Sequence, residues 1–158
     1  HPEQQVVIRR AFSHRLVRET PTSSNRHPLI DGWVEACGVA LGSSYCAAGC
    51  CECLSSVRRI RCAGALALVR QLEPIEEPVA ACCFSYPTDG EGHGHCGLVT
   101  GVSAIEVMTW EFNVDSAQGW HRRLRKGLRF GRWVRSAGTT PIVVAKAPFR
   151  GQVMTGTR

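Results

Sequence analysis

The sequence lacks a hydrophobic run long enough to cross a membrane, which takes about 20 consecutive apolar residues. It also lacks, at its start, a basic segment followed by an apolar one, so we expect no cleaved secretion signal. These two absences lead us to expect a protein made in the cytoplasm without a membrane span.

The cysteines lack the pattern of a secreted disulfide framework. Such frameworks use an even number of cysteines at dispersed spacings, whereas this chain has nine, with adjacent pairs among them. We therefore expect reduced, buried thiols. The nine are Cys37, Cys46, Cys50, Cys51, Cys53, Cys62, Cys82, Cys83 and Cys96.

Acidic residues are few relative to basic ones, 13 against 19, which gives a formal net charge of +6 and a pI near 9.0. Such a surface attracts anionic polymers, whether nucleic acid, membrane or bacterial cell wall, and charge alone does not choose among them. With 44% of the residues hydrophobic and 20% charged, the composition is typical of a globular protein and argues against wholesale disorder. A chain of 158 residues, taken as residues 1–158, is long enough for one domain with its own core.

The order of the predicted elements indicates an α+β domain. Apolar residues at helical spacing predict helices over 5–18, 29–41, 46–57 and 62–72. After Pro74 and Pro78 the pattern changes to short apolar or alternating runs, which predict strands over 79–84, 96–102, 104–112, 128–134 and 141–145. Helices followed by antiparallel strands are typical of the α+β class.

The stretch GSSYCAAGCCECL, residues 42–54, predicts a helix with a cysteine in its first turn. Ser43 or Ser44 can cap the helix by accepting bonds from free backbone N–H groups. Cys46 then lies where those groups and the helix dipole lower a thiol pKa and favour the nucleophilic thiolate. For Cys50 and Cys53, which follow at helical spacing, we favour the simpler interpretation of one buried helical face.

A histidine and two possible orienting groups lie on the predicted strands. His95 stands where a glycine-rich loop enters a strand, and the next strand carries Glu111 and Asn113, two residues apart and hence on one face. A nucleophile, a base and a group that orients the base form the general triad arrangement. The alternatives are a loop histidine or metal ligand at His95 and a solvated strand charge at Glu111.

Three motifs resemble those of CHAP-type amidohydrolase/peptidases, relatives of the NlpC/P60 enzymes with a papain-like core. GSSYCAA is similar to the family's G-x-x-[YW]-C-A-A signature, GHCGLVTGV to its G-H-V-G-I-V-x-G strand, and WEFN to its E-x-N strand. The resemblance covers about residues 25–115. It implies a papain-like core in which N-terminal helices pack on an antiparallel sheet and the catalytic cysteine begins a helix.

The resemblance also implies roles for residues. Cys46 is expected to be the nucleophile, His95 the general base and Glu111 the group that orients the imidazole, with Asn113 as its substitute. Backbone N–H groups near the start of the Cys46 helix are expected to bind the oxyanion. No cofactor or metal is implied.

By the same resemblance the substrate is peptidoglycan, cut at the N-acetylmuramoyl-L-alanine amide or at a peptide bond of the stem or crossbridge. The protein is expected to act as a monomer at the bacterial cell wall. Phage endolysin, virion-associated hydrolase and antibacterial effector are all compatible with the resemblance, and each would need its own route of delivery.

The sequence departs from the family pattern at three places. Gly49 replaces a bulky aromatic residue after C-A-A, and Cys96 replaces a valine beside the histidine. A Gly-Asp pair is also missing before the run 78–84. These departures bear on activity and substrate more than on fold.

Two alternatives of another class remain open. The first is a zinc-binding module, although only Cys50 and Cys53 have the C-x-x-C spacing that structural zinc sites use. The second is a nucleic-acid-binding module on the segment 121–135, HRRLRKGLRFGRWVR, in which seven Lys and Arg residues alternate with aromatic ones and no acid occurs. For that segment we favour a solvated basic face that is attracted to anionic wall polymers, so nucleic acid is not our expected partner.

Overall fold

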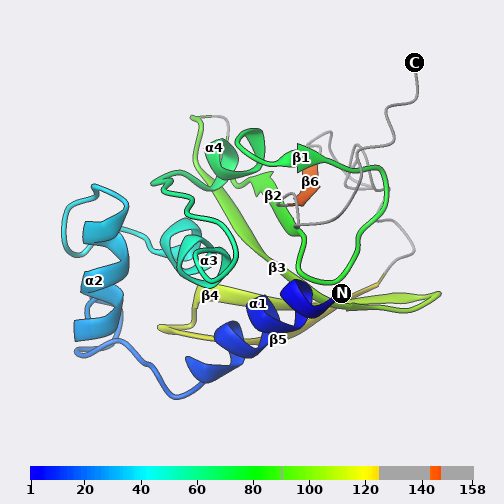
Figure 1. The fold of residues 1–158 in the computed structure, drawn as a ribbon. Helices are drawn as coiled ribbons and strands as arrows, with labels where there is room; N and C mark the ends of the chain where they lie inside the picture. The colour runs from blue at the N-terminus through cyan, green and yellow to red at the C-terminus, as the bar shows by residue number, and fades with distance from the viewer. Residues whose placement is uncertain (90, 125–142, 147–158) are drawn as a thin grey trace.

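The computed structural model describes residues 1–89, 91–124 and 143–146, which form an α+β structure (Figure 1). Helices come first along the chain and strands follow, as the sequence predicts. The elements are α1 (Pro2–Ser13), α2 (Pro28–Ala36), α3 (Cys46–Leu54), α4 (Ala65–Arg70), β1 (Glu73–Pro74), β2 (Cys83–Pro87), β3 (Gly94–Val102), β4 (Glu106–Val114), β5 (Ala117–Leu124) and β6 (Val143–Lys146).

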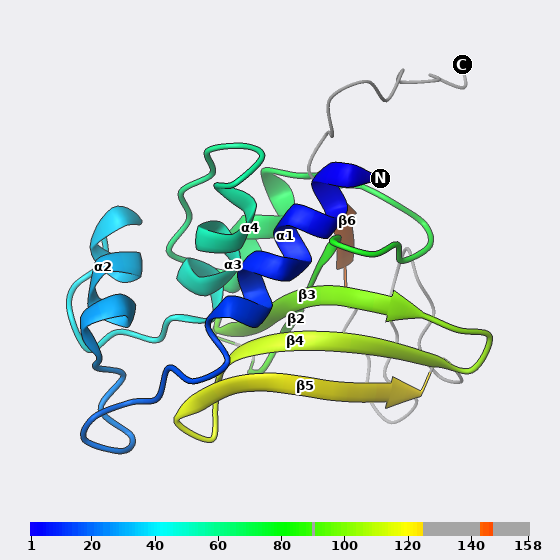
Figure 2. The same ribbon diagram turned by 60° about the horizontal axis from the view of Figure 1, so that its bottom comes forward.

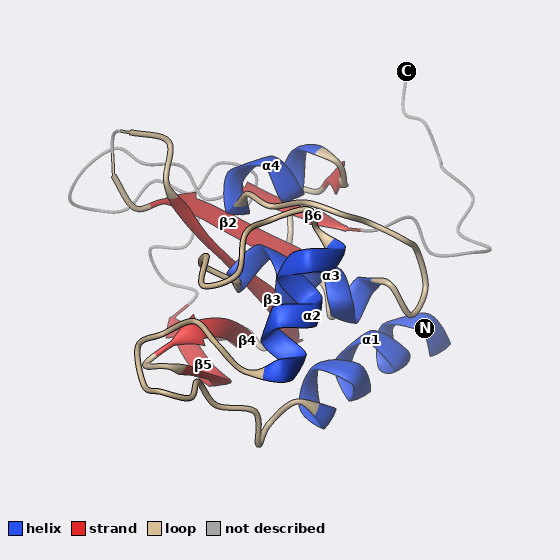
Figure 3. Ribbon diagram, turned by 90° about the vertical axis from the view of Figure 1, so that its left-hand side faces the viewer, coloured by secondary structure: helices blue, strands red, loops and turns tan. Residues whose placement is uncertain are grey.

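The strands form one antiparallel sheet in the order β1-β6-β2-β3-β4-β5. Helices α1 and α3 lie on the same side of β3, β4 and β5 (Figure 2). Helix α3 contacts β3 and β4, and α4 contacts β2 and β3. Helix α2 packs against α3 and lies in front of it in the view of Figure 3. Helix α3 is therefore enclosed between the sheet and other helices.

All four predicted helices end earlier than the sequence pattern indicates. Helix α3 stops at Leu54 instead of residue 57, and α4 spans only 65–70 of the predicted 62–72. Helix α1 stops at Ser13 instead of residue 18, and Arg18 makes an isolated β-bridge with Ala117 of β5. Helix α2 stops at Ala36 instead of residue 41, and Gly38 takes a left-handed conformation with φ of 73° just after it. Glycine is well suited to that conformation and commonly follows the end of a helix.

The predicted strands are confirmed in part. Strands β3 and β4 match 96–102 and 104–112 within two residues, whereas β2 begins at Cys83, after Ala81 with a left-handed φ of 66°. Strand β5 was not predicted at all. The predicted strand 128–134 lies outside the described residues, and β6 overlaps the last part of 141–145.

Side chains from α3 fill the core. Cys50 and Cys53 are fully buried, which confirms the predicted apolar helical face. Gly49 allows α3 to approach β4, because a Cβ on Gly49 would lie 2.4 Å from the ring of Phe112. All nine cysteines are free thiols, as expected. Among the residues described, no helix has the length and apolar character needed to cross a membrane.

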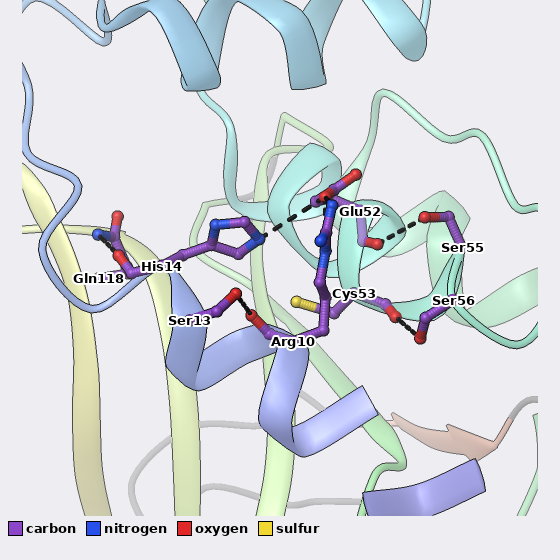
Figure 4. A network of polar contacts seen from close by, with 8 residues as sticks. All are labelled: Arg10, Ser13, His14, Glu52, Cys53, Ser55, Ser56 and Gln118. Carbon is purple, nitrogen blue, oxygen red and sulfur yellow. Dashed lines mark hydrogen bonds and ion pairs between the residues drawn. The ribbon is translucent and has the colours of Figure 1, made fainter. Parts of the chain in front are cut away.

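Polar contacts attach α1 to α3 and to β5 (Figure 4). Arg10 forms an ion pair with Glu52 of α3, and His14 Nε2 lies 3.6 Å from the same carboxylate. Gln118 of β5 donates hydrogen bonds to the carbonyls of His14 and Val17. The N-terminal helix is thus fixed against both the central helix and the far edge of the sheet.

Candidate active site

Cys46 is the first residue of α3 and has 5% of its surface exposed. The predicted serine cap is wrong: Tyr45 occupies the N-cap position without a side-chain cap bond. The Ser44 hydroxyl instead accepts a hydrogen bond from Asn113 Nδ2 at 2.5 Å. The Tyr45 hydroxyl donates to the carbonyl of Ala117 at 3.2 Å and so anchors the start of the helix to β5.

The environment of Cys46 strongly favours its thiolate. A hydrogen bond with the Cys96 thiol lowers its pKa, burial raises it, and a hydrogen bond and the charge of His95 lower it further, to about 4. Hydrogen bonds to the charged form and a nearby cation are the usual means by which proteins activate a thiol. Cys46 and His95 are therefore brought together in space, although 49 positions separate them along the chain.

His95, on β3, is held between Cys46 and Glu111. Its Nε2 donates a hydrogen bond to Glu111 Oε2 at 2.8 Å, and 15% of its side chain is exposed. Burial lowers the pKa of the imidazole, but hydrogen bonds with Cys46 and Glu111, together with their charges, raise it to about 9. Because Nε2 is engaged by Glu111, Nδ1 is the nitrogen available to the thiol.

Glu111 is a buried carboxylate with 2% of its surface exposed, so its interpretation as a solvated strand charge is wrong. One carboxylate oxygen accepts from His95, and the other accepts from the Thr109 hydroxyl at 2.7 Å. Thr109 is also buried and lies on the same face of β4 as Glu111. The carboxylate is therefore fixed from two directions.

The Asn113 side chain bonds to Ser44 and not to His95. The residue has a left-handed φ of 60°, and the register of β4 with β5 shifts between Phe112 and Val114. This irregularity breaks the alternation that was expected to put Asn113 on the same face as Glu111. Its described side-chain hydrogen bond goes to Ser44, so the residue that contacts His95 is Glu111.

The two charged groups coexist over a wide pH range. With pKa values of about 4 for Cys46 and about 9 for His95, the pair is a thiolate and an imidazolium at neutral pH.

The start of α3 offers backbone N–H groups to a negative oxygen. The first helical hydrogen bond runs from the backbone N–H of Gly49 to the carbonyl of Tyr45. The N–H groups that precede it, including that of Cys46, have no carbonyl partner within the helix and can receive a negative oxygen.

Sequence reasoning missed three residues that contact this group. Cys96 is fully buried and forms a hydrogen bond with Cys46; the sequence showed it only as a departure from a motif. Thr109 could have been found from its spacing, since Thr109 and Glu111 share a strand face. Tyr86 also packs edge-on against the His95 ring, with centroids 5.7 Å apart.

A cavity of about 470 Å³ lies between α4 and the β1–β2 part of the sheet, near the start of β3. Leu66, on its wall, packs against Gly94, the residue before His95. Pro87, another wall residue, is the strand partner of Gly94. The lining is mostly apolar and consists of Leu66, Val69, Arg70, Leu72, Pro74, Ser85 and Pro87.

The described part of the chain gives little support to a zinc-binding or nucleic-acid-binding module. Within residues 1–89, 91–124 and 143–146, no group of three or more His, Cys, Asp or Glu side chains is arranged to hold a metal ion. His93 instead pairs with Asp89 in an exposed loop at 2.6 Å. Of the basic segment 121–135, only 121–124 are described, and they belong to β5.

Comparisons of the chain with protein-family models, with curated proteins and with solved structures find no match.

Proposed function

We propose that the chain is a cysteine-dependent amide hydrolase of the CHAP type, with a papain-like core, that acts on peptidoglycan. The observation that carries the proposal is the charged pair of Cys46 and His95, held by a buried Glu111. The three motifs that resemble the family begin α3, form β3 and lie in β4, and they supply the three residues in contact, Cys46, His95 and Glu111.

In the proposed reaction the Cys46 thiolate attacks the carbonyl carbon of the scissile amide, and a carbon–sulfur bond forms. The negative oxygen of the tetrahedral intermediate is stabilised by backbone N–H groups at the start of α3. The His95 imidazolium then gives its proton to the leaving nitrogen as the carbon–nitrogen bond breaks, which leaves a thioester.

Hydrolysis of the thioester uses the same groups, with His95 now accepting a proton instead of donating one. The neutral His95 takes a proton from water, and the resulting hydroxide attacks the thioester carbon. The carbon–sulfur bond breaks, and the Cys46 thiolate and the imidazolium are restored. Glu111 stabilises the imidazolium in both halves of the cycle and keeps Nε2 engaged, so that Nδ1 performs each transfer.

The test is digestion of purified sacculi, with mass spectrometry of the released muropeptides. The unmodified protein is expected to release fragments with new amine and carboxyl ends, and Cys46→Ala to reduce the rate by at least about 10³-fold. Cys82→Ala is the matched control, because Cys82 is buried in a separate small cluster with Phe84, Val99 and Val107. Equal release by Cys46→Ala and the unmodified protein would refute the hydrolase proposal.

The identity of the released ends also decides which bond is cut. Free carboxyl groups on N-acetylmuramic acid, together with free L-alanine amino groups, would identify an amidase, and new termini within the stem or crossbridge an endopeptidase. The proposed place of action is the bacterial cell wall, reached by phage, secretion-system or lysis delivery.

A further inference from the structure

A second thiol pair lies away from Cys46, on the opposite side of α3. Cys51 faces α2, whereas Cys50 faces Cys83 and Cys96 of the sheet. Cys37, which caps the C-terminal end of α2, forms a hydrogen bond with the Cys51 thiol. Cys51 is also hydrogen-bonded to the carbonyl of Cys62 at 3.8 Å.

Both thiols open into one cavity of about 210 Å³ between α2, α3 and the segment after α3. Cys37 is partly exposed and lines the cavity. Arg59 and Arg61, both exposed, also line the cavity. The carboxylate of Glu52, another lining residue, is neutralised by its ion pair with Arg10.

The two thiols differ in ionisation. A hydrogen bond with Cys51 lowers the pKa of Cys37, burial raises it, and the Cys62 backbone and the Arg61 charge lower it again, to about 6. The same hydrogen bond and burial raise the pKa of Cys51. One thiolate beside one protonated thiol is the arrangement in which one sulfur attacks and the other resolves.

We propose that Cys37 and Cys51 form a redox-active thiol pair that reacts with anionic low-molecular-weight disulfides of the glutathione type. The positive cavity suits such a reagent, since Arg59 and Arg61 can bind its carboxylates. The metal-binding alternative lacks ligands, because no cluster of three suitable side chains occurs in the described ranges. The pair acts independently of the proposed hydrolase chemistry.

The exchange proceeds in two balanced steps. The Cys37 thiolate attacks one sulfur of the glutathione disulfide; the bond between the two glutathione sulfurs breaks, and one glutathione thiolate leaves. The Cys51 sulfur then attacks the Cys37 sulfur of the mixed disulfide. The second glutathione leaves as a thiol with the proton from Cys51, and a disulfide joins the end of α2 to α3. The protein thiols are oxidised, and the reagent is reduced to two glutathione molecules.

The test treats the full chain carrying Cys46→Ala with glutathione disulfide, so that the reactive Cys46 does not contribute. Mass spectrometry after an acid quench is expected to show loss of two hydrogens and a peptide that links Cys37 to Cys51. Adding Cys51→Ser should stop the reaction at a glutathione adduct on Cys37, and adding Cys37→Ser should prevent both products. Cys82→Ala, in the separate small cluster, is the control that should leave the linkage intact.

A second measurement does not depend on cysteine substitutions. Arg59→Gln, which leaves the Arg61 charge beside Cys37 in place, should slow oxidation by glutathione disulfide by about twofold or more and leave the rate with neutral 2-hydroxyethyl disulfide unchanged. The proposal is overturned by a stable glutathione adduct in the chain with both cysteines, or by linkage to another cysteine. It is equally overturned if the arginine variant slows both reagents alike.

Discussion

At the scale of single residues, Cys46 should react as a thiolate far below the pH at which ordinary thiols do. Its pKa of about 4 predicts that alkylation by iodoacetamide stays fast from pH 8 to pH 5 and falls by half near pH 4. The rate is measured by limited alkylation followed by peptide mass spectrometry, which separates Cys46 from the other cysteines. His95→Ala should move the midpoint to higher pH, since the imidazole stabilises the thiolate. A midpoint near pH 8.5 in the unmodified protein would contradict the assigned pair.

Glu111 should affect the rate of hydrolysis by raising the pKa of His95. Because its hydrogen bond and charge help to raise the pKa of His95 to about 9, Glu111→Gln should lower that pKa. The alkaline limb of the rate profile for sacculus digestion should then move below pH 9, with the rate at neutral pH reduced by about 10²-fold. Asn113→Ala is the matched control on the same strand, and it should leave the alkaline limb in place, because Asn113 bonds to Ser44. Equal shifts in both variants would show that Glu111 has only a structural role.

At the scale of elements, the close approach of α3 to β4 explains why residue 49 is a glycine. The ring of Phe112 occupies the space beside Gly49, with Cγ only 2.4 Å from the position of a Cβ. Gly49→Ala should therefore lower the free energy of unfolding by about 1–3 kcal/mol in urea denaturation, because the helix must move or the ring must leave its rotamer.

The control for this prediction is Gly32→Ala in α2. Gly32 has no atom within 4 Å of the position that a Cβ would take, and it lies on an exposed part of the helix. There the substitution should stabilise by about 0.5–1 kcal/mol through helix propensity alone. Combining Gly49→Ala with Phe112→Leu should recover part of the loss, since the two residues are in contact. Additive losses in the double variant would mean that the contact does not limit the packing.

Local sequence patterns were sufficient for the elements that carry the candidate site. Helix α3 begins at Cys46 because small apolar residues follow a glycine and serine turn. Strand β3 follows from a short apolar run, and β4 from alternating residues. Strand β5 was missed because its residues are mainly polar, and its pairing with β4 depends on a hairpin. That hairpin contains Asn113, Asp115 and Ser116 in left-handed conformations, which sequence alone does not reveal.

The site residues likewise divide into those that local sequence patterns predict and those that depend on long-range contacts. Cys46, His95 and Glu111 could be predicted because each stands at a position defined by its own element. The bond of Asn113 to Ser44 and the approach of Cys96 to Cys46 join residues 69 and 50 positions apart. Such contacts depend on how α3 is set against the sheet, which is decided by packing over the whole core.

At the scale of the whole molecule, the charged pair should make stability depend on pH. The pKa of Cys46 falls from 9.0, the value of an unperturbed thiol, to about 4 in the fold, so its contribution is complete above pH 9 and is lost as pH falls through 4. The pKa of His95 rises from 6.5 to about 9, so its contribution is complete below pH 6.5 and is lost as pH rises through 9.

The two contributions together determine how this pair makes the free energy of unfolding vary with pH. From pH 4 to 6.5 the unfolded chain holds one more proton, on Cys46, so the free energy of unfolding should rise by up to about 1.4 kcal/mol per pH unit. From pH 6.5 to 9 the extra proton on Cys46 in the unfolded chain balances the one on His95 in the fold, so this pair adds no slope. The thiols of Cys37 and Cys50, whose pKa values fall to about 6, add a rise of their own in that range.

Urea denaturation of the unmodified protein and of Cys46→Ala across this range measures the effect. Burial lowers the pKa of His14 and adds its own rise below pH 6.5, but that rise is common to both proteins and cancels in the difference. The difference between the two curves should therefore grow from pH 4 to 6.5, because the variant lacks the thiolate that titrates in that window. Parallel curves would mean that Cys46 does not ionise within the fold, and the proposed nucleophile would then have no charge with which to attack.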